Sequence, residues 1–155
     1  MNFFVNNRQI VKNLGINTAT TGAATYTALC TTSEITLNTD AEMKDFYVFC
    51  DAIQRHLMTG SNLALECTVK VDVNNAAVMN IFNKVNTLLS SGTITQFNNV
   101  MIQFDVLTSV TDSVLTYTTY TAPVIMEVSD IGGAAEDEGE YSLTLSLNGP
   151  ATAAA

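Results

Sequence analysis

The chain has 155 residues, of which 47% are hydrophobic and only 14% are charged, and its net charge at pH 7 is −9. Average soluble proteins carry about 25% charged residues, and here small neutral side chains, above all threonine and asparagine, replace the missing charge. We expect one domain with a real core. Because a lone monomer usually has a more charged surface, we expect a partner to cover part of this one, the alternative being a monomer with a neutral coat.

The charges are unevenly placed along the chain. All six basic residues lie in the first 84 positions, and after Lys84 there are eight acidic residues and no base. This argues against a surface that grips nucleic acid, which needs Lys and Arg to neutralise phosphates. It is compatible with a surface past which nucleic acid slides.

Targeting signals and a disulfide framework are not apparent. No stretch approaches the roughly 18 apolar residues of a membrane span, and residues 1–13 lack the order of a signal peptide. Cys30, Cys50 and Cys67 are an odd number at wide spacings. Synthesis in a reducing cytoplasm, without a membrane, fits best.

The first elements in chain order are an arm and a strand. Residues 1–24 hold an apolar opening followed by small polar residues, and they predict an arm or loop without a core of its own. Residues 25–38 are rich in threonine and alternate between apolar and polar in their second half, which is strand chemistry.

Residues 39–73 allow two interpretations. As a helix, Thr39 and Glu42 form a capping box and Gly60 stands where a C-terminal cap belongs. The helix would place these apolar residues on one face: Met43, Phe46, Phe49, Cys50, Ile53 and Leu57. As strands, residues 45–52 form one strand, and residues 63–73 form a second in which every other residue is apolar. Local pattern alone favours the helix.

The remainder of the chain gives clearer signals. Residues 75–90 carry one apolar stripe at helical spacing, with Asn74 or Asn75 as the N-cap and Gly92 just past the end. After Gly92 the segments "NVMIQFDVL", "SVLTYTTYT" and "VIMEVSDI" are strands, with Pro123 separating the last two. A final strand places its apolar residues inward from Tyr141 to Leu147. The total is mainly β with one α-helix: a β-sandwich or open barrel.

The sequence offers little catalytic chemistry. His56 is the only histidine, and although Cys50 lies six positions away, no G-x-S-x-G elbow supports a nucleophile. The cysteines lack zinc-site spacing, "DIGGAAEDEGE" does not match a calcium loop, and no glycine-rich stretch has a phosphate-cradling pattern. A hydrolase built on paired carboxylates stays open, because their separation is not legible from sequence. We expect no enzyme, no cofactor and no metal.

Three stretches in order resemble the major tail tube proteins of tailed bacteriophages. They are "CTTSEITLN", "NNAAVMNIFNKVNTLLSSGTI" and the closing "YTAPVIMEVSDIGGAAEDEGEYSLTLSLNGP". The resemblance implies a tail tube domain over residues 25–150, followed by a short tail over 151–155. It also implies strands over residues 44–73, including an extended hairpin that touches the adjacent ring, and we adopt this over the local helix pattern.

The resemblance further implies a structural virion protein that assembles in the host cytoplasm. Its partners would be copies of itself in stacked hexameric rings, the tape-measure, tail terminator and baseplate or distal tail proteins, and DNA in transit. Alternatives are the inner tube of a contractile injection, bacteriocin or type VI-like secretion system. A further alternative is a carbohydrate-binding β-sandwich that uses Tyr117 and Tyr120.

The same resemblance places the acidic turn at the end of a ring or at the rim of the lumen. The acids of this turn are Glu136, Asp137, Glu138 and Glu140. They would pair with bases of the next ring, for which the candidates are Arg8, Lys12, Lys44 and Arg55. The alternative is that these acids only solvate a turn.

Overall fold

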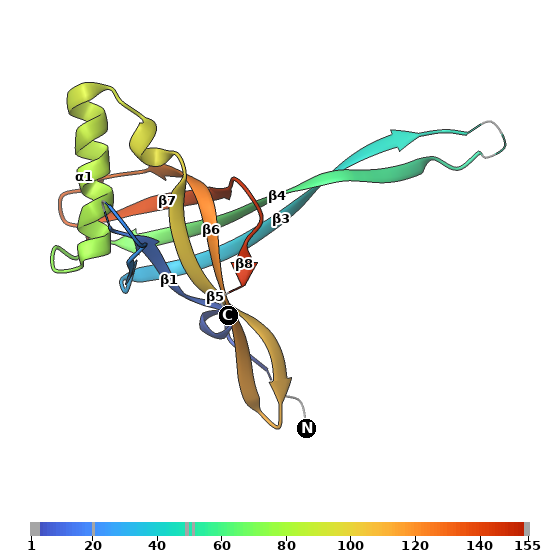
Figure 1. Cartoon of the computed structure of the whole chain (residues 1–155), viewed down its shortest axis with the longest axis horizontal. Helices are drawn as coiled ribbons and strands as arrows, with labels where there is room; N and C mark the ends of the chain where they lie inside the picture. The colour runs from blue at the N-terminus through green and yellow to red at the C-terminus, as the bar shows by residue number, and fades with distance from the viewer. Residues whose placement is uncertain (1–3, 20, 49, 51, 154–155) are drawn as a thin grey trace.

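In the computed structural model, which describes residues 4–19, 21–48, 50 and 52–153, the chain forms one antiparallel sheet and one α-helix (Figure 1). The sheet has eight strands in the order β2-β1-β5-β6-β7-β4-β3, and β8 pairs with β6. The strands are β1 (Val11–Asn17), β2 (Tyr26–Ala28), β3 (Thr32–Phe46), β4 (Arg55–Lys70), β5 (Val100–Thr111), β6 (Val114–Ser129), β7 (Glu140–Leu147) and β8 (Thr152–Ala153). The predicted class, mainly β with one helix in an open barrel, is confirmed.

The sheet curls without closing. Its two ends come together because a short turn joins β2 directly to β3, and β1 contacts β3. No ladder of hydrogen bonds joins β1 to β3 within the described residues. The result is a barrel with one open seam.

Alternation along the strands builds the core. Leu65, Cys67 and Val69 of β4 and Tyr141 and Leu143 of β7 are buried, and the residues between them point outward. The inward alternation predicted for residues 63–73 and for the last strand is therefore confirmed, although Val73 lies beyond the end of β4 and is 71% exposed.

The helix α1 (Ala76–Ser91) lies over one end of this core (Figure 1). Asn75 caps it, since its side chain accepts hydrogen bonds from the backbone of Ala77 and Val78, and Gly92 ends it in the left-handed conformation at φ +69°. Ala77, Val78 and Ile81 are buried under it. Caps and stripe together made this helix predictable. The short 3-10 helices are η1 (Asn7–Gln9) and η2 (Thr95–Phe97).

The expectation of an N-terminal arm or loop without a core over residues 1–24 is wrong for residues 11–17, which form β1. Val11, Leu14 and Ile16 are buried in the core. The alternation is hidden because a bulge falls between Lys12 and Gly15, with Asn13 at φ +56°. Gly15 allows a close approach there, since a Cβ would lie 3.2 Å from the carbonyl oxygen of Thr27, which is a tight contact. The 151–155 tail likewise contributes β8.

The helical interpretation of residues 39–60 is also wrong. The strand assignment adopted from the resemblance is largely confirmed, because β3 runs to Phe46 and β4 covers residues 55–70. Thr39 pairs with Leu63 and Met43 with Met58 across a two-stranded ribbon. Phe49 and Asp51 lie outside the described residues. Cross-strand pairing therefore overrides a helix-like spacing of apolar residues.

Strand β6 runs without interruption through Pro123, where we expected a break. Pro123 opposes Met101 of β5, and its carbonyl accepts a hydrogen bond from the backbone of Asn148. The N and C=O of one residue point to the same side of a strand, so the missing N–H faces the gap between β7 and β8. No ladder partner is lost there.

Candidate assembly interface

The described residues hold no cluster of metal-binding side chains, because no group of three or more His, Cys, Asp or Glu among them is placed to hold a metal ion. No helix in this part of the chain is long and apolar enough to cross a membrane. The features that stand out are surfaces.

The largest such feature is the part of the β3–β4 hairpin that projects from the body, residues 39–63, which we call the arm (Figure 1). Strand β7 pairs with β4 only at residues 64–70, so the arm is two strands wide. It exposes a set of large apolar side chains that no core covers: Met43, Phe46, Tyr47, Val48, Ile53, Leu57 and Met58. Large apolar side chains exposed in such number on one projecting segment favour an interaction site.

Polar contacts across the ribbon hold the arm in register. Nδ1 of His56 lies 2.5 Å from the Asp45 carboxylate, and the amide of Asn62 donates to Glu42. His56 is thus an exposed partner of an arm carboxylate. The predicted contact residues Lys44 and Arg55 pair with Leu57 and Phe46 in the backbone register and point from the arm surface.

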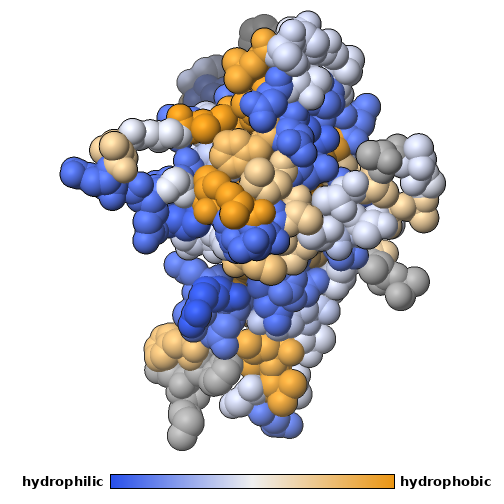
Figure 2. Space-filling view, turned by 90° about the vertical axis from the view of Figure 1, so that its left-hand side faces the viewer, coloured by the Kyte–Doolittle hydropathy of each residue, from blue (hydrophilic) through white to orange (hydrophobic). Residues whose placement is uncertain are grey.

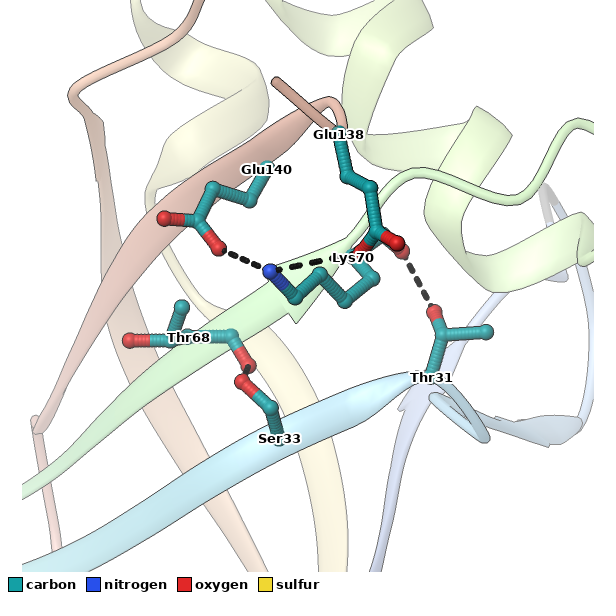
Figure 3. A network of polar contacts seen from close by, with 6 residues as sticks. All are labelled: Thr31, Ser33, Thr68, Lys70, Glu138 and Glu140. Carbon is teal, nitrogen blue, oxygen red and sulfur yellow. Dashed lines mark hydrogen bonds and ion pairs between the residues drawn. The ribbon is translucent and has the colours of Figure 1, made fainter.

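The acidic turn lies at the opposite side of the body from the arm (Figure 1). Lys70 at the end of β4 contacts two of its acids, with Nζ 2.7 Å from Glu140 and 3.7 Å from Glu138 (Figure 3). The hydrogen bond to Glu140 raises the pKa of Lys70. Because all three groups are well exposed, these ion pairs contribute little stability. Glu136 and Asp137 project into solvent.

Lys70 was not among the predicted partners of the acids. The signal was present, because β4 and β7 pair antiparallel and the register sets Lys70 opposite Glu140. The four predicted bases lie elsewhere: Arg8 in η1, Lys12 in β1, and Lys44 and Arg55 on the arm. A single subunit therefore does not bring them to the acidic turn, and their pairing with a second subunit stays a prediction.

Lys12 has a partner of its own. Its ammonium lies 3.8 Å from the ring centroid of Tyr117, and the Tyr117 hydroxyl donates to the carbonyl of Gln9 at 2.7 Å. Tyr120 packs against Phe104, with ring centroids 6.0 Å apart. Both tyrosines are thus engaged within the subunit.

The outward face of β6, β7, β4 and β3 carries hydroxyl and carboxylate groups. One row across it reads Glu127, Thr144, Glu66 and Thr36, and the next reads Ser129, Ser142, Thr68 and Glu34. We call these two rows the hydroxyl–carboxylate face. They contain three acids and no base. Lys70, at the border of this face, is occupied by Glu138 and Glu140.

The helix side of the body looks different. Seen from that side, apolar areas are separated by hydrophilic ones (Figure 2). Exposed apolar residues occur in α1 and its flanking loops, among them Val73, Leu89 and Ile94. Isolated apolar residues of this kind are ordinary on protein surfaces, so this side gives a weaker indication of an interface than the arm does.

Comparisons with solved structures identify the architecture. The chain is similar to the tail of an empty GTA particle with C6 symmetry, with a TM-score of 0.61 and 12% identity over 98% of this chain and 100% of the other. It is similar to the PVC sheath/tube terminator of an extracellular contractile injection system, with a TM-score of 0.59 and 10% identity over 99% of each chain. The sheath-tube complex of that system gives a TM-score of 0.55 at 9% identity over 99% of this chain and 93% of the other.

No protein-family model and no curated protein matches the sequence. At these identities the structural likeness shows the fold alone: the chain has a tail-tube-type fold along nearly its whole length. The fold implied by the three sequence stretches is therefore confirmed.

Proposed function

We propose that this protein is a tail tube subunit that polymerises as stacked hexameric rings, forming a conduit for DNA in a phage or phage-like virion. The observation that carries the proposal is the full-length similarity to the tail of a particle with C6 symmetry. Particles of that kind are named gene transfer agents. Each subunit would be made in the host cytoplasm and would finish in the tail.

The open seam and the arm support self-assembly. Among the described residues, β2 and β3 end the sheet and each has one unpaired edge. Such an edge is a hazard for a monomer and a joining surface in an oligomer. The arm exposes apolar side chains well beyond the body. In a closed ring each subunit presents one surface to the next subunit, and the arm reaches the adjacent ring.

Charge supports the part of the proposal that concerns DNA. The hydroxyl–carboxylate face offers short polar groups and three carboxylates without a base. A wall of this composition repels phosphates and provides no cation to hold them. We assign this face to the lumen of the tube.

Other tail proteins would complete the assembly. A terminator and a baseplate would cap the ends, and a tape-measure protein would set the length. An inner tube of a contractile injection system is the second candidate, favoured by the similarity to a sheath-tube complex. The two proposals share the polymer and differ in cargo, and a sheath gene beside this one would favour the second.

Negative-stain electron microscopy of the purified protein tests the proposal. Rings or hollow tubes are the expected result over a range of concentrations. The matched control is a chain in which residues 43–58 are replaced by a two-residue turn, which removes the outer part of the arm and keeps the pairing of β4 with β7. That variant should keep its melting temperature and remain unpolymerised. A wild-type protein that stays monomeric at high concentration would refute the proposal.

A further inference from the structure

The open seam of the barrel is a groove with an apolar floor. It has a volume of about 790 Å³ and lies between β1 with η1 on one side and the first half of β3 on the other. Val11, Leu14 and Leu29 at its base are buried, and Ile35 and Leu37 pack against the core beside it. The apolar surface that stays accessible in the groove comes from Ile10, which is 40% exposed, and from the partly buried Ile35, Leu37 and Val106. No segment of the described chain covers it.

One wall of this groove also offers unpaired backbone. Strand β3 pairs with β4 along one edge, and along the groove its other edge has no ladder within the described residues. An unpaired edge next to an apolar floor favours an extended segment, because such a segment can satisfy the backbone and bury alternate side chains. The expected occupant is therefore β-like and apolar.

The arm has these properties, but a subunit's own arm is excluded by geometry. Strand β3 passes from the groove at residues 32–37 straight into the arm at residues 39–46, and the arm extends away from the body (Figure 1). Strand β3 could fold back over its own groove only by breaking its pairing with β4. The occupant must come from a second copy.

Charge favours the same match. The η1–β1 side of the groove carries Arg8 and Lys12, and the β3 side carries one acid, Glu34. The described part of the arm carries three acids, Asp40, Glu42 and Asp45, against two bases, Lys44 and Arg55. A net negative ribbon therefore approaches a rim that is basic on its η1–β1 side, which steers the encounter.

We propose that the groove between β1 and β3 is the receptor for the arm of another subunit. The contact is head-to-tail, because each subunit offers one groove and one arm. This inference rests on the proposed function, since it names the place where one tube subunit receives its neighbour. It also gives Arg8 and Lys12 acidic partners on the arm instead of on the acidic turn.

Native cysteines provide the first test. Cys30 lies in the groove wall and Cys50 at the turn of the arm, both exposed, whereas Cys67 is buried. Concentrated wild-type protein treated with a bismaleimide should give a ladder of linked subunits on a denaturing gel. Peptide mass spectrometry should then find Cys30 joined to Cys50. The variants Cys30→Ser and Cys50→Ser should each abolish this mixed link.

A substitution in the groove provides the second test. Ile10 lines the groove and is 40% exposed, so Ile10→Glu should leave the subunit folded and abolish polymers seen by electron microscopy. The matched control is Leu89→Glu on the exposed face of α1, outside both groove and arm, which should polymerise. Suppose that the wild type forms polymers. If Ile10→Glu then also assembles normally and the Cys30–Cys50 link is absent, the docking proposal is overturned while the proposed function stands. If the wild type forms neither polymers nor links, docking and proposed function both fail.

Discussion

The ring of Phe82 on α1 meets the ring of Tyr141 on β7 edge to face, with centroids 5.3 Å apart and planes at 87°. The Tyr141 hydroxyl reaches the backbone carbonyl of Val78 at 3.4 Å. Tyr141 is 1% exposed. This contact fastens α1, the only α-helix among the described residues, to the sheet.

Substitutions that shorten the Tyr141 side chain should therefore destabilise the subunit, and the loss should depend on how much of the side chain is removed. Tyr141→Ala removes a buried aromatic ring and should lower the free energy of unfolding by about 3–5 kcal/mol. Tyr141→Phe keeps the ring and should cost about 1 kcal/mol, because a single long hydrogen bond is lost. Chemical denaturation of the two variants measures both effects. Tyr47→Ala on the arm is the control, since Tyr47 is 68% exposed and should change the value little. Equal losses for Tyr141→Ala and Tyr141→Phe would contradict the packing role.

Alkaline pH should weaken the fold through Cys67. Burial raises the pKa of this thiol to about 12, from 9.0 for an unperturbed cysteine. Between these values the unfolded chain has lost the proton and the folded chain retains it, so stability falls as pH rises. The slope from this group is about 1.4 kcal/mol per pH unit. It is absent below pH 9, where both states are protonated.

Denaturant titrations at pH 8, 9, 10 and 11 measure that slope. Cys67→Ala is less stable at every pH because it leaves a cavity, but its curve should be flatter above pH 9. Burial also raises the pKa of Tyr141, which adds a second loss above about pH 10. If the stabilities of the wild type and Cys67→Ala fell in parallel above pH 9, the Cys67 thiol would lose its proton as easily in the folded chain as in the unfolded chain, and the prediction would be wrong.

The acidic turn can be tested without disturbing its internal ion pairs. Glu136→Lys with Asp137→Lys reverses the two solvent-exposed acids and leaves Glu138 and Glu140 on Lys70. If the turn meets another ring, this double variant should impair stacking while its circular dichroism and melting temperature stay unchanged. Adding Glu138→Lys should strengthen the defect. Full-length tubes from the triple variant would show that these acids have no role in ring stacking.

The lumen assignment predicts a change in DNA retention. Replacing Glu34, Glu66 and Glu127 with lysine turns a repulsive wall into an attractive one, and assembled tubes should retain DNA on the order of tenfold more than wild-type tubes at low salt. The retained DNA should resist nuclease and be released by salt. The three glutamine replacements are the matched control, because they remove charge without adding a cation. Lysine tubes that retain no more DNA than wild-type tubes would place this face away from the channel.

The sequence predicted those parts of the fold that are locally encoded. The stripe and caps of α1 and the alternation of β7 depend on neighbours in sequence, so Asn75, Gly92 and Tyr141 were placed correctly. Strand β1 was missed because its bulge at Asn13 breaks the period of two. The continuity of β6 was missed because Pro123 loses no ladder hydrogen bond only when its position faces the gap between β7 and β8. That gap is a tertiary feature.

The surfaces were less predictable than the strands. The acids of the turn were recognisable as a cluster, but their partner Lys70 follows from the pairing of β4 with β7. The groove could not be foreseen at all, since it is made by segments around Val11, Leu29 and Ile35 and by a seam that does not close. Local pattern even favoured a helix for the arm, because Met43, Ile53 and Leu57 fit helical spacing. An apolar residue on a docking ribbon looks like a core residue when no partner is visible.

The width of the arm has a kinetic consequence. A hairpin without a third strand or a core is marginally stable in water, so much of the entropy loss of fixing residues 39–63 falls on the association step. Spontaneous nucleation should then be slow, and elongation from an existing end should be fast. Seeding a fresh solution with sheared fragments should eliminate the lag, and a cell could withhold tube growth simply by withholding the initiating template.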